Sequence, residues 1–112
     1  MVNTKTELLS PVGSFEALSA AIDAGADSIY FGAGKLNMRS RSSYNFSLED
    51  ITKVTNICLE RGIKTYLTLN TLIYDNDIEV ASEILMAAKK AKISAIIASD
   101  ISIIQMAHNL GL

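Results

Sequence analysis

The chain has 112 residues, of which 49% are hydrophobic and 20% charged, and its net charge is -2. This composition is typical of an ordered globular protein and excludes an intrinsically disordered one. The small negative charge gives no general electrostatic reason for tight nucleic-acid binding. No apolar run approaches the roughly 20 residues of a membrane span, and the first six residues are polar. We therefore expect a cytoplasmic protein that does not contact the membrane.

The chain repeats one pattern four times: a short apolar strand, a polar turn and an amphipathic helix. The expected strands cover residues 7–9, 28–31, 64–69 and 95–98, where β-branched and aromatic residues gather. Apolar residues at helical spacing follow each strand and predict a helix between it and the next strand.

Capping residues mark where these helices begin. Ser14 and Asp100 are suited to cap the first and fourth helices, and Ser47 to Asp50 resembles a capping box for the second. Asn76 and Glu79 are spaced to form another box before the third helix. Glycines that can adopt the left-handed conformation mark three helix ends, at Gly25, Gly62 and Gly111.

Strands and helices that alternate without hairpin turns predict an α/β fold with a parallel sheet and right-handed crossovers. A doubly wound open sheet and a TIM-like barrel both fit four such units, and the similarity of successive units favours the barrel. A complete barrel needs about 250 residues. We therefore expect residues 1–112 to form the N-terminal half of a TIM-like barrel domain, truncated before the fifth strand.

The loop after the second expected strand is the first candidate for a functional site. It covers residues 32–46, and loops longer than roughly 12 to 15 residues are often functional. Asn37, Arg39, Arg41 and Asn45 lie in it, and such side chains suit a carboxylate or phosphate, although a solvated loop explains them equally well. The glycines at its start imitate a dinucleotide fingerprint, but the third glycine position holds Asn37 and no helix follows at once, so that interpretation is rejected.

Polar residues also stand where the third and fourth strands end. In parallel α/β folds, ligands bind at the carboxyl ends of the strands. Thr68 and Asn70 share one face of the third strand, and Thr71 follows them. These three residues and Asp100 are therefore candidate substrate-binding residues, with strand-end hydrogen bonding and helix capping as their alternatives.

Other reactive residue types are scarce. Cys58 is the single cysteine, which excludes an internal disulfide or a multi-cysteine metal site, and its apolar helical face indicates a core residue. His108 is the single histidine and lies near a helix end, where a surface role is expected. The residues alone assign no catalytic group, no metal and no cofactor to this chain.

Five segments in order resemble the collagenase-like peptidases, peptidase U family thirty-two. They cover nearly the whole chain: residues 7–18 (ELLSPVGSFEAL), 24–32 (AGADSIYFG), 37–41 (NMRSR), 45–47 (NFS) and 66–72 (YLTLNTL). The resemblance implies a TIM-barrel-like catalytic domain, of which this is the first half, and a hydrolase whose catalytic residues are undefined.

The same resemblance implies an alternative activity. Other relatives of this family are oxygen-independent hydroxylation factors that act on transfer RNA, ribosomal RNA or a quinone precursor, with cysteines that hold an iron–sulfur cluster. Those cysteines belong downstream of the segments present here, so a cluster is expected only in a full-length parent. Three hypotheses follow: part of a peptidase, part of an RNA or small-molecule hydroxylation factor, and a binding module without turnover.

The half-barrel architecture also predicts self-association. It leaves an open strand edge and an uncovered apolar face, which proteins rarely tolerate. We expect this chain alone to be inactive and to pair with itself through the open sheet edge.

Overall fold

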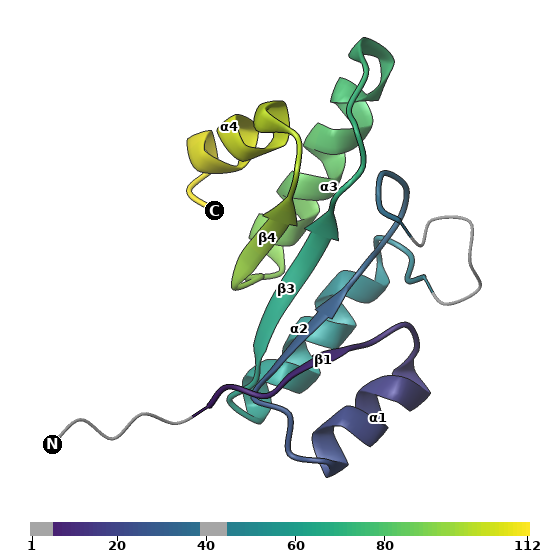
Figure 1. Ribbon diagram of the computed structural model, residues 1–112, viewed down its shortest axis with the longest axis vertical. Helices are drawn as coiled ribbons and strands as arrows, with labels where there is room; N and C mark the ends of the chain where they lie inside the picture. Colours follow the sequence, from purple (N-terminus) through teal and green to yellow (C-terminus); the bar gives the residue numbers. More distant parts are fainter. Residues whose placement is uncertain (1–5, 39–44) are drawn as a thin grey trace, which may run out of the picture.

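The computed structural model describes residues 6–38 and 45–112. Strands and helices alternate along these ranges, and all four strands form one parallel sheet in the order β1-β2-β3-β4 (Figure 1). This sequential order is that of a barrel wall, because a doubly wound sheet reverses its strand order near the middle. The elements are β1 (Leu9–Pro11), α1 (Phe15–Asp23), β2 (Ser28–Phe31), α2 (Asp50–Glu60), β3 (Lys64–Leu69), the 3-10 turn η1 (Asp75–Asp77), α3 (Ile78–Lys90), β4 (Ala95–Ala98) and α4 (Ile101–Asn109).

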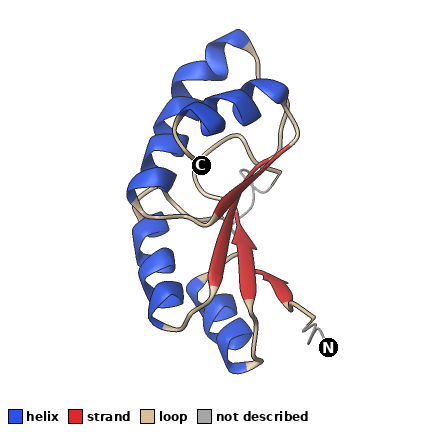
Figure 2. Ribbon diagram, turned by 90° about the vertical axis from the view of Figure 1, so that its left-hand side faces the viewer, coloured by secondary structure: helices blue, strands red, loops and turns tan. Residues whose placement is uncertain are grey.

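The helices lie on one side of the sheet and leave its other face uncovered (Figure 2). Strand side chains alternate between the two faces. Ile29, Leu67 and Leu69 point toward the helices and are fully buried, whereas Tyr30 and Tyr66, which are direct partners across β2 and β3, are only half-buried. We call the uncovered side the open face. In a closed barrel this face would line the interior.

Local signals in the sequence account for the helix ends. The Ser14 hydroxyl accepts a hydrogen bond from the Ala17 N–H at 3.1 Å, and Asp100 caps α4 in the same way through Ser102. Gly25 and Gly62 follow α1 and α2 with φ of +87° and +69°, a region that favours glycine. These predicted starts and stops are confirmed.

Two expected boundaries were wrong. The first strand is Leu9–Pro11 rather than residues 7–9, because its parallel register pairs Leu9 with Ser28. The expected box of Asn76 and Glu79 does not form. Instead the Asp77 carboxylate accepts a hydrogen bond from the Tyr74 N–H at 3.0 Å and closes η1. Helix α3 therefore begins at Ile78, one residue later than a cap at Asn76 would place it.

Candidate functional site

Side-chain hydrogen bonds tie together the carboxyl ends of β2, β3 and β4. The Thr68 hydroxyl donates to the Phe31 carbonyl at 3.1 Å, and the Met38 N–H donates to Asn70 Oδ1 at the same distance. The Ser99 hydroxyl donates to the Asn70 carbonyl, also at 3.1 Å. Asn70 therefore joins the loop after β2 to the end of β4. The structure thus brings the candidate residues Thr68 and Asn70 together at this end of the sheet.

A small depression of about 50 Å³ lies on the open face at these strand ends. Its lining residues are Tyr30, Phe31, Gly32, Met38, Thr68 and Asn70. The bond from the Met38 N–H requires an acceptor, so the oxygen of the Asn70 amide faces that backbone. The Nδ2 group, which carries two donors, has no acceptor among the described residues. The depression therefore presents a fixed amide donor beside the Thr68 hydroxyl.

Asn37 is buried inside the loop rather than directed to solvent. Its side chain is 2% exposed, and its Nδ2 lies 3.5 Å from the carbonyls of Ala33 and Gly34. A Cβ placed on Gly32 would lie 2.4 Å from Asn37 Oδ1, far inside contact distance. Gly32 and Asn37 thus fit together as a pair, and Asn37 packs against Gly32, which is one of the lining residues of the depression.

Asn45 closes the base of the same loop. Its Nδ2 donates to the Gly34 carbonyl at 2.8 Å, while the Phe46 N–H donates to the Gly32 carbonyl at 3.1 Å. The Asn45 Oδ1 atom is buried and has no hydrogen-bond partner among the described residues. A buried amide oxygen without a donor is costly, so the fold tolerates a local loss of stability at this position.

Thr71 and Asp100 differ in how much of their hydrogen-bonding capacity the fold uses. The Thr71 hydroxyl is buried and has no partner in residues 6–38 and 45–112. Both Asp100 oxygens are used: one accepts from the Ser102 hydroxyl at 2.6 Å, and the other accepts from the Ile73 N–H at 2.9 Å. Asp100 therefore caps α4 and holds the β3–α3 connection. Arg39 and Arg41, the basic pair predicted in the loop, lie outside the described residues.

Cys58 and His108 show no sign of a reactive role. Cys58 is fully buried in α2, and burial raises the pKa of its thiol to about 11, so it stays protonated and inert. His108 is exposed on α4. The described residues contain no group of three or more histidine, cysteine or acidic side chains suited to a metal ion. An iron–sulfur cluster usually takes four cysteines, so the single cysteine of this sequence does not fit such a cluster.

Sequence reasoning named only Thr68 and Asn70 among the residues that line the depression, and it missed the other four, Tyr30, Phe31, Gly32 and Met38. Tyr30 was visible only as one aromatic residue of an apolar strand. Because side chains alternate along β2, Tyr30 lies on the other face of the strand from the buried Ile29 and Phe31. It is therefore on the open face, where it lines the depression with Thr68. The Met38 backbone N–H orients the Asn70 amide, and no residue type signals a backbone donor.

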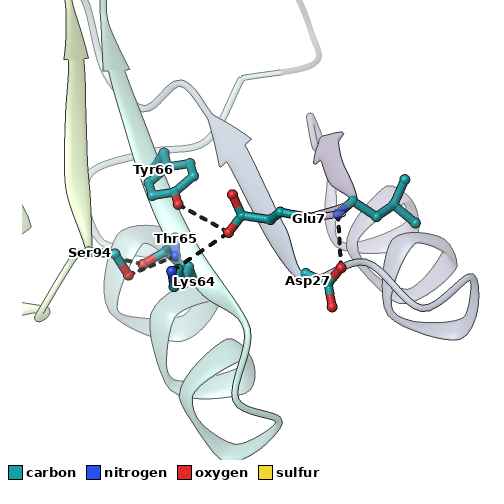
Figure 3. A network of polar contacts seen from close by, with 7 residues as sticks. Glu7, Asp27, Lys64, Thr65, Tyr66 and Ser94 are labelled. Carbon is teal, nitrogen blue, oxygen red and sulfur yellow. Dashed lines mark hydrogen bonds and ion pairs between the residues drawn. The ribbon is translucent and has the colours of Figure 1, made fainter. Parts of the chain in front are cut away.

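The opposite, amino-terminal end of the sheet carries a polar network with a structural role (Figure 3). Lys64 lies 3.8 Å from the Glu7 carboxylate, and the Tyr66 hydroxyl donates to the same carboxylate at 3.4 Å. Ser94 and Thr65 exchange hydrogen bonds between β3 and β4. In barrels this end supports stability rather than catalysis, and exposed ion pairs stabilise by roughly 1 kcal/mol or less.

Comparison with known proteins decides the family. The sequence profile of Peptidase family U32 matches residues 13–112. The chain belongs to this family. It is 54% identical over 105 residues to a "Collagenase" of Porphyromonas gingivalis, a match that covers 94% of this chain and 25% of the relative. It is also 30% identical over 105 residues to "tRNA hydroxylation protein P1" of Bacillus subtilis, covering 94% of this chain and 25% of that protein. The chain thus spans about a quarter of the length of these relatives.

Comparison of structures supports the barrel architecture. The chain superposes on the crystal structure of a monomeric form of the normally dimeric phosphoribosylanthranilate isomerase from Thermotoga maritima, with a TM-score of 0.60. The match covers 93% of this chain and 48% of the isomerase, at 14% sequence identity. The four parallel βα units therefore have the arrangement found in about half of this TIM-type barrel. None of the helices in residues 6–38 and 45–112 has the length and apolarity needed to cross a bilayer.

Proposed function

We propose that this chain supplies the substrate-binding first half of the barrel in a peptidase of family U32, and that the carboxyl-end depression binds peptide. The observation that carries the proposal is the orientation of Asn70. Its oxygen is held by the Met38 N–H, so Nδ2 is left to donate to an acceptor on the open face. A peptide backbone presents such acceptors as carbonyl groups at every residue.

Neighbouring groups suit the other half of a peptide unit. The Thr68 hydroxyl gives its proton to the Phe31 carbonyl, so its lone pairs are available to accept from a peptide N–H. Donor and acceptor side by side match the alternating carbonyl and N–H groups of an extended chain. The net charge of -2 favours this ligand over RNA, whose phosphates require a basic surface.

Peptide hydrolysis adds water across an amide C–N bond and therefore needs an activated water or nucleophile. Cys58 is buried and His108 is exposed on α4, 50 positions later in the sequence. These two residues therefore form no pair of nucleophile and base among the described residues. The proposal therefore assigns binding and orientation of the peptide to this chain. It assigns the attacking group to a part of the full-length protein that corresponds to the unmatched three quarters of the relatives.

The test is peptide cleavage by the full-length protein that carries this chain. Asn70→Asp keeps an oxygen for the Met38 N–H but replaces the two donors by a negative charge. Losing one such hydrogen bond costs on the order of 1–3 kcal/mol. We therefore expect kcat/KM for a collagen-like peptide to fall about tenfold or more. Asn56→Asp, at an exposed position of α2, adds the same charge elsewhere and serves as the control. Equal kcat/KM values for the two variants would contradict the proposed role.

A second candidate function rests on the 30% identity with the tRNA hydroxylation protein over 94% of this chain. In this alternative, the full-length protein holds an iron–sulfur cluster outside this chain, and the loop of residues 32–46 contacts RNA phosphate. Anaerobic purification followed by iron and acid-labile sulfide analysis separates the two functions. Stoichiometric iron and sulfide would favour hydroxylation, and their absence would favour hydrolysis.

A further inference from the structure

Three exposed hydrophobic side chains stand in the connections that follow β2 and β3. Met38, Leu72 and Tyr74 are 76%, 67% and 66% exposed. Both strands are paired on each side within this chain, so the lack of a neighbouring strand does not account for this exposure. We call these three side chains the apolar rim. Ligand sites commonly combine a few placed polar groups with a mainly apolar surround.

The connection after β3 holds two of the rim side chains in place. In Figure 1 this connection extends beyond the carboxyl end of the sheet. Ile73 packs against the hydrophobic core between Leu72 and Tyr74, and its N–H donates to the Asp100 carboxylate at 2.9 Å. The Tyr74 N–H donates to the Asp77 carboxylate at 3.0 Å. The backbone of Leu72 and Tyr74 is therefore ordered before any ligand binds, which lowers the cost of binding.

Met38 joins the rim to the depression. It is one of the residues that line the depression, and its N–H donates to Asn70 Oδ1 at 3.1 Å. Leu72 follows Asn70 by two positions, which span no more than about 7 Å. Neighbouring residues of an extended peptide are about 3.3 Å apart. A peptide whose carbonyl accepts from Asn70 Nδ2 therefore has the rim within reach of its adjacent residues.

The charges near the rim favour a peptide over a nucleic acid. Residues 70–88 contain no lysine, arginine or histidine, and their four acidic residues are Asp75, Asp77, Glu79 and Glu83. The first two of these directly follow the rim residue Tyr74 and its 3-10 turn η1. Such a connection repels phosphate groups and tolerates an uncharged ligand.

We propose that the apolar rim binds the side chains next to the peptide unit held by Asn70, so that the preferred substrates are peptides with apolar residues at those positions. This inference rests on the proposed function, because it requires a peptide in the depression. The competing occupant of the rim is another part of the full-length protein. Met38 favours the substrate, because a permanent cover over this residue would also lie against the depression that it lines.

Peptide binding by the full-length protein tests the proposal. Two fluorescently labelled peptides of glycine and alanine are compared by anisotropy, one with leucine and the other with serine at the same interspersed positions. We expect the leucine peptide to bind about fivefold or more tightly. Leu72→Ser and Tyr74→Ser should each reduce this preference towards equality. Met86→Ser, at a 60% exposed position about two turns into α3, is the control and should leave the preference unchanged.

Asn70→Asp separates the failure of this inference from that of the proposed function. This variant should weaken the binding of both peptides by the same factor. If the parent protein binds both peptides equally well and Asn70→Asp still weakens both, the rim has no role, although the proposed function stands. If neither peptide binds, both proposals are overturned. A preference for leucine that persists in Leu72→Ser and Tyr74→Ser would arise elsewhere and would also overturn the role of the rim.

Urea denaturation of the free full-length protein identifies the competing occupant. A serine at a water-exposed position changes little buried surface, so the midpoints of Leu72→Ser and Tyr74→Ser should stay within about 0.3 M of the parent value. A fall of about 1 M in both variants would show that another part of the protein covers the rim. That result would overturn the proposal.

Discussion

The contact between Gly32 and Asn37 offers a stability prediction that isolates one cause. A Cβ on Gly32 would lie 2.4 Å from Asn37 Oδ1 and 2.6 Å from its Cγ, while Asn37 itself is 2% exposed and has no room to withdraw. Overpacking of this kind costs typically 1–3 kcal/mol. We therefore expect Gly32→Ala to lower the free energy of unfolding by about 2 kcal/mol.

Urea denaturation measures this cost, and a double-mutant cycle assigns it. With an m value of about 1–3 kcal/mol per molar urea, a loss of 2 kcal/mol moves the midpoint by roughly 1 M. Asn37→Ala removes the atoms that the new Cβ would meet. In that background, Gly32→Ala should cost well under 1 kcal/mol, which gives a clear interaction energy. If the two changes are additive, the close contact is not the reason for glycine at position 32 and the reasoning fails.

Two further predictions concern titratable groups. Hydrogen bonds from the Ser102 hydroxyl and from the N–H groups of Ile73 and Ser102 lower the pKa of Asp100 below its usual 3.8. A carboxyl whose pKa is lower in the folded state stabilises the fold at pH values above its pKa in the unfolded chain. This stabilisation is lost as the pH falls through the pKa of the folded state. Asp100→Asn should therefore flatten the fall in urea midpoint between about pH 6 and pH 2.5, and an unchanged slope would contradict this. Cys58, fully buried with a pKa of about 11, should react with a thiol reagent only after unfolding. Rapid labelling of the native chain would show that the side chain is accessible.

The strands and helices were predictable because each carries a local signal. Ser14 and Asp100 cap helices through their own side chains, and Gly25 supplies the positive φ that ends α1. The errors arose where tertiary contacts decide the boundary. The register of β1 depends on the pairing of Leu9 with Ser28, a partner 19 positions away, and no local pattern encodes that choice.

Individual site residues were predictable, but their roles depend on atoms that the sequence does not place. Thr68 and Asn70 were found by strand alternation, and the structure places both at the carboxyl end of β3, where hydrogen bonds join it to its neighbours. Which end of the Asn70 amide is available depends on the Met38 backbone, which no pattern reveals. Asn37 fits the pattern of an exposed loop donor, yet it packs behind Gly32. Whether these residues bind substrate stays a prediction.

The central claim, that the Asn70 amide binds a peptide carbonyl, can be measured directly by NMR. The side-chain amide signals of Asn70 and Asn56 in the 112-residue chain are followed while a collagen-like peptide is added, and again with a tRNA fragment. The account predicts that the Asn70 signals shift in a saturable way with the peptide while those of Asn56, exposed on α2, stay in place. Asn70 signals that do not move with the peptide, or that move only with the RNA, would contradict it.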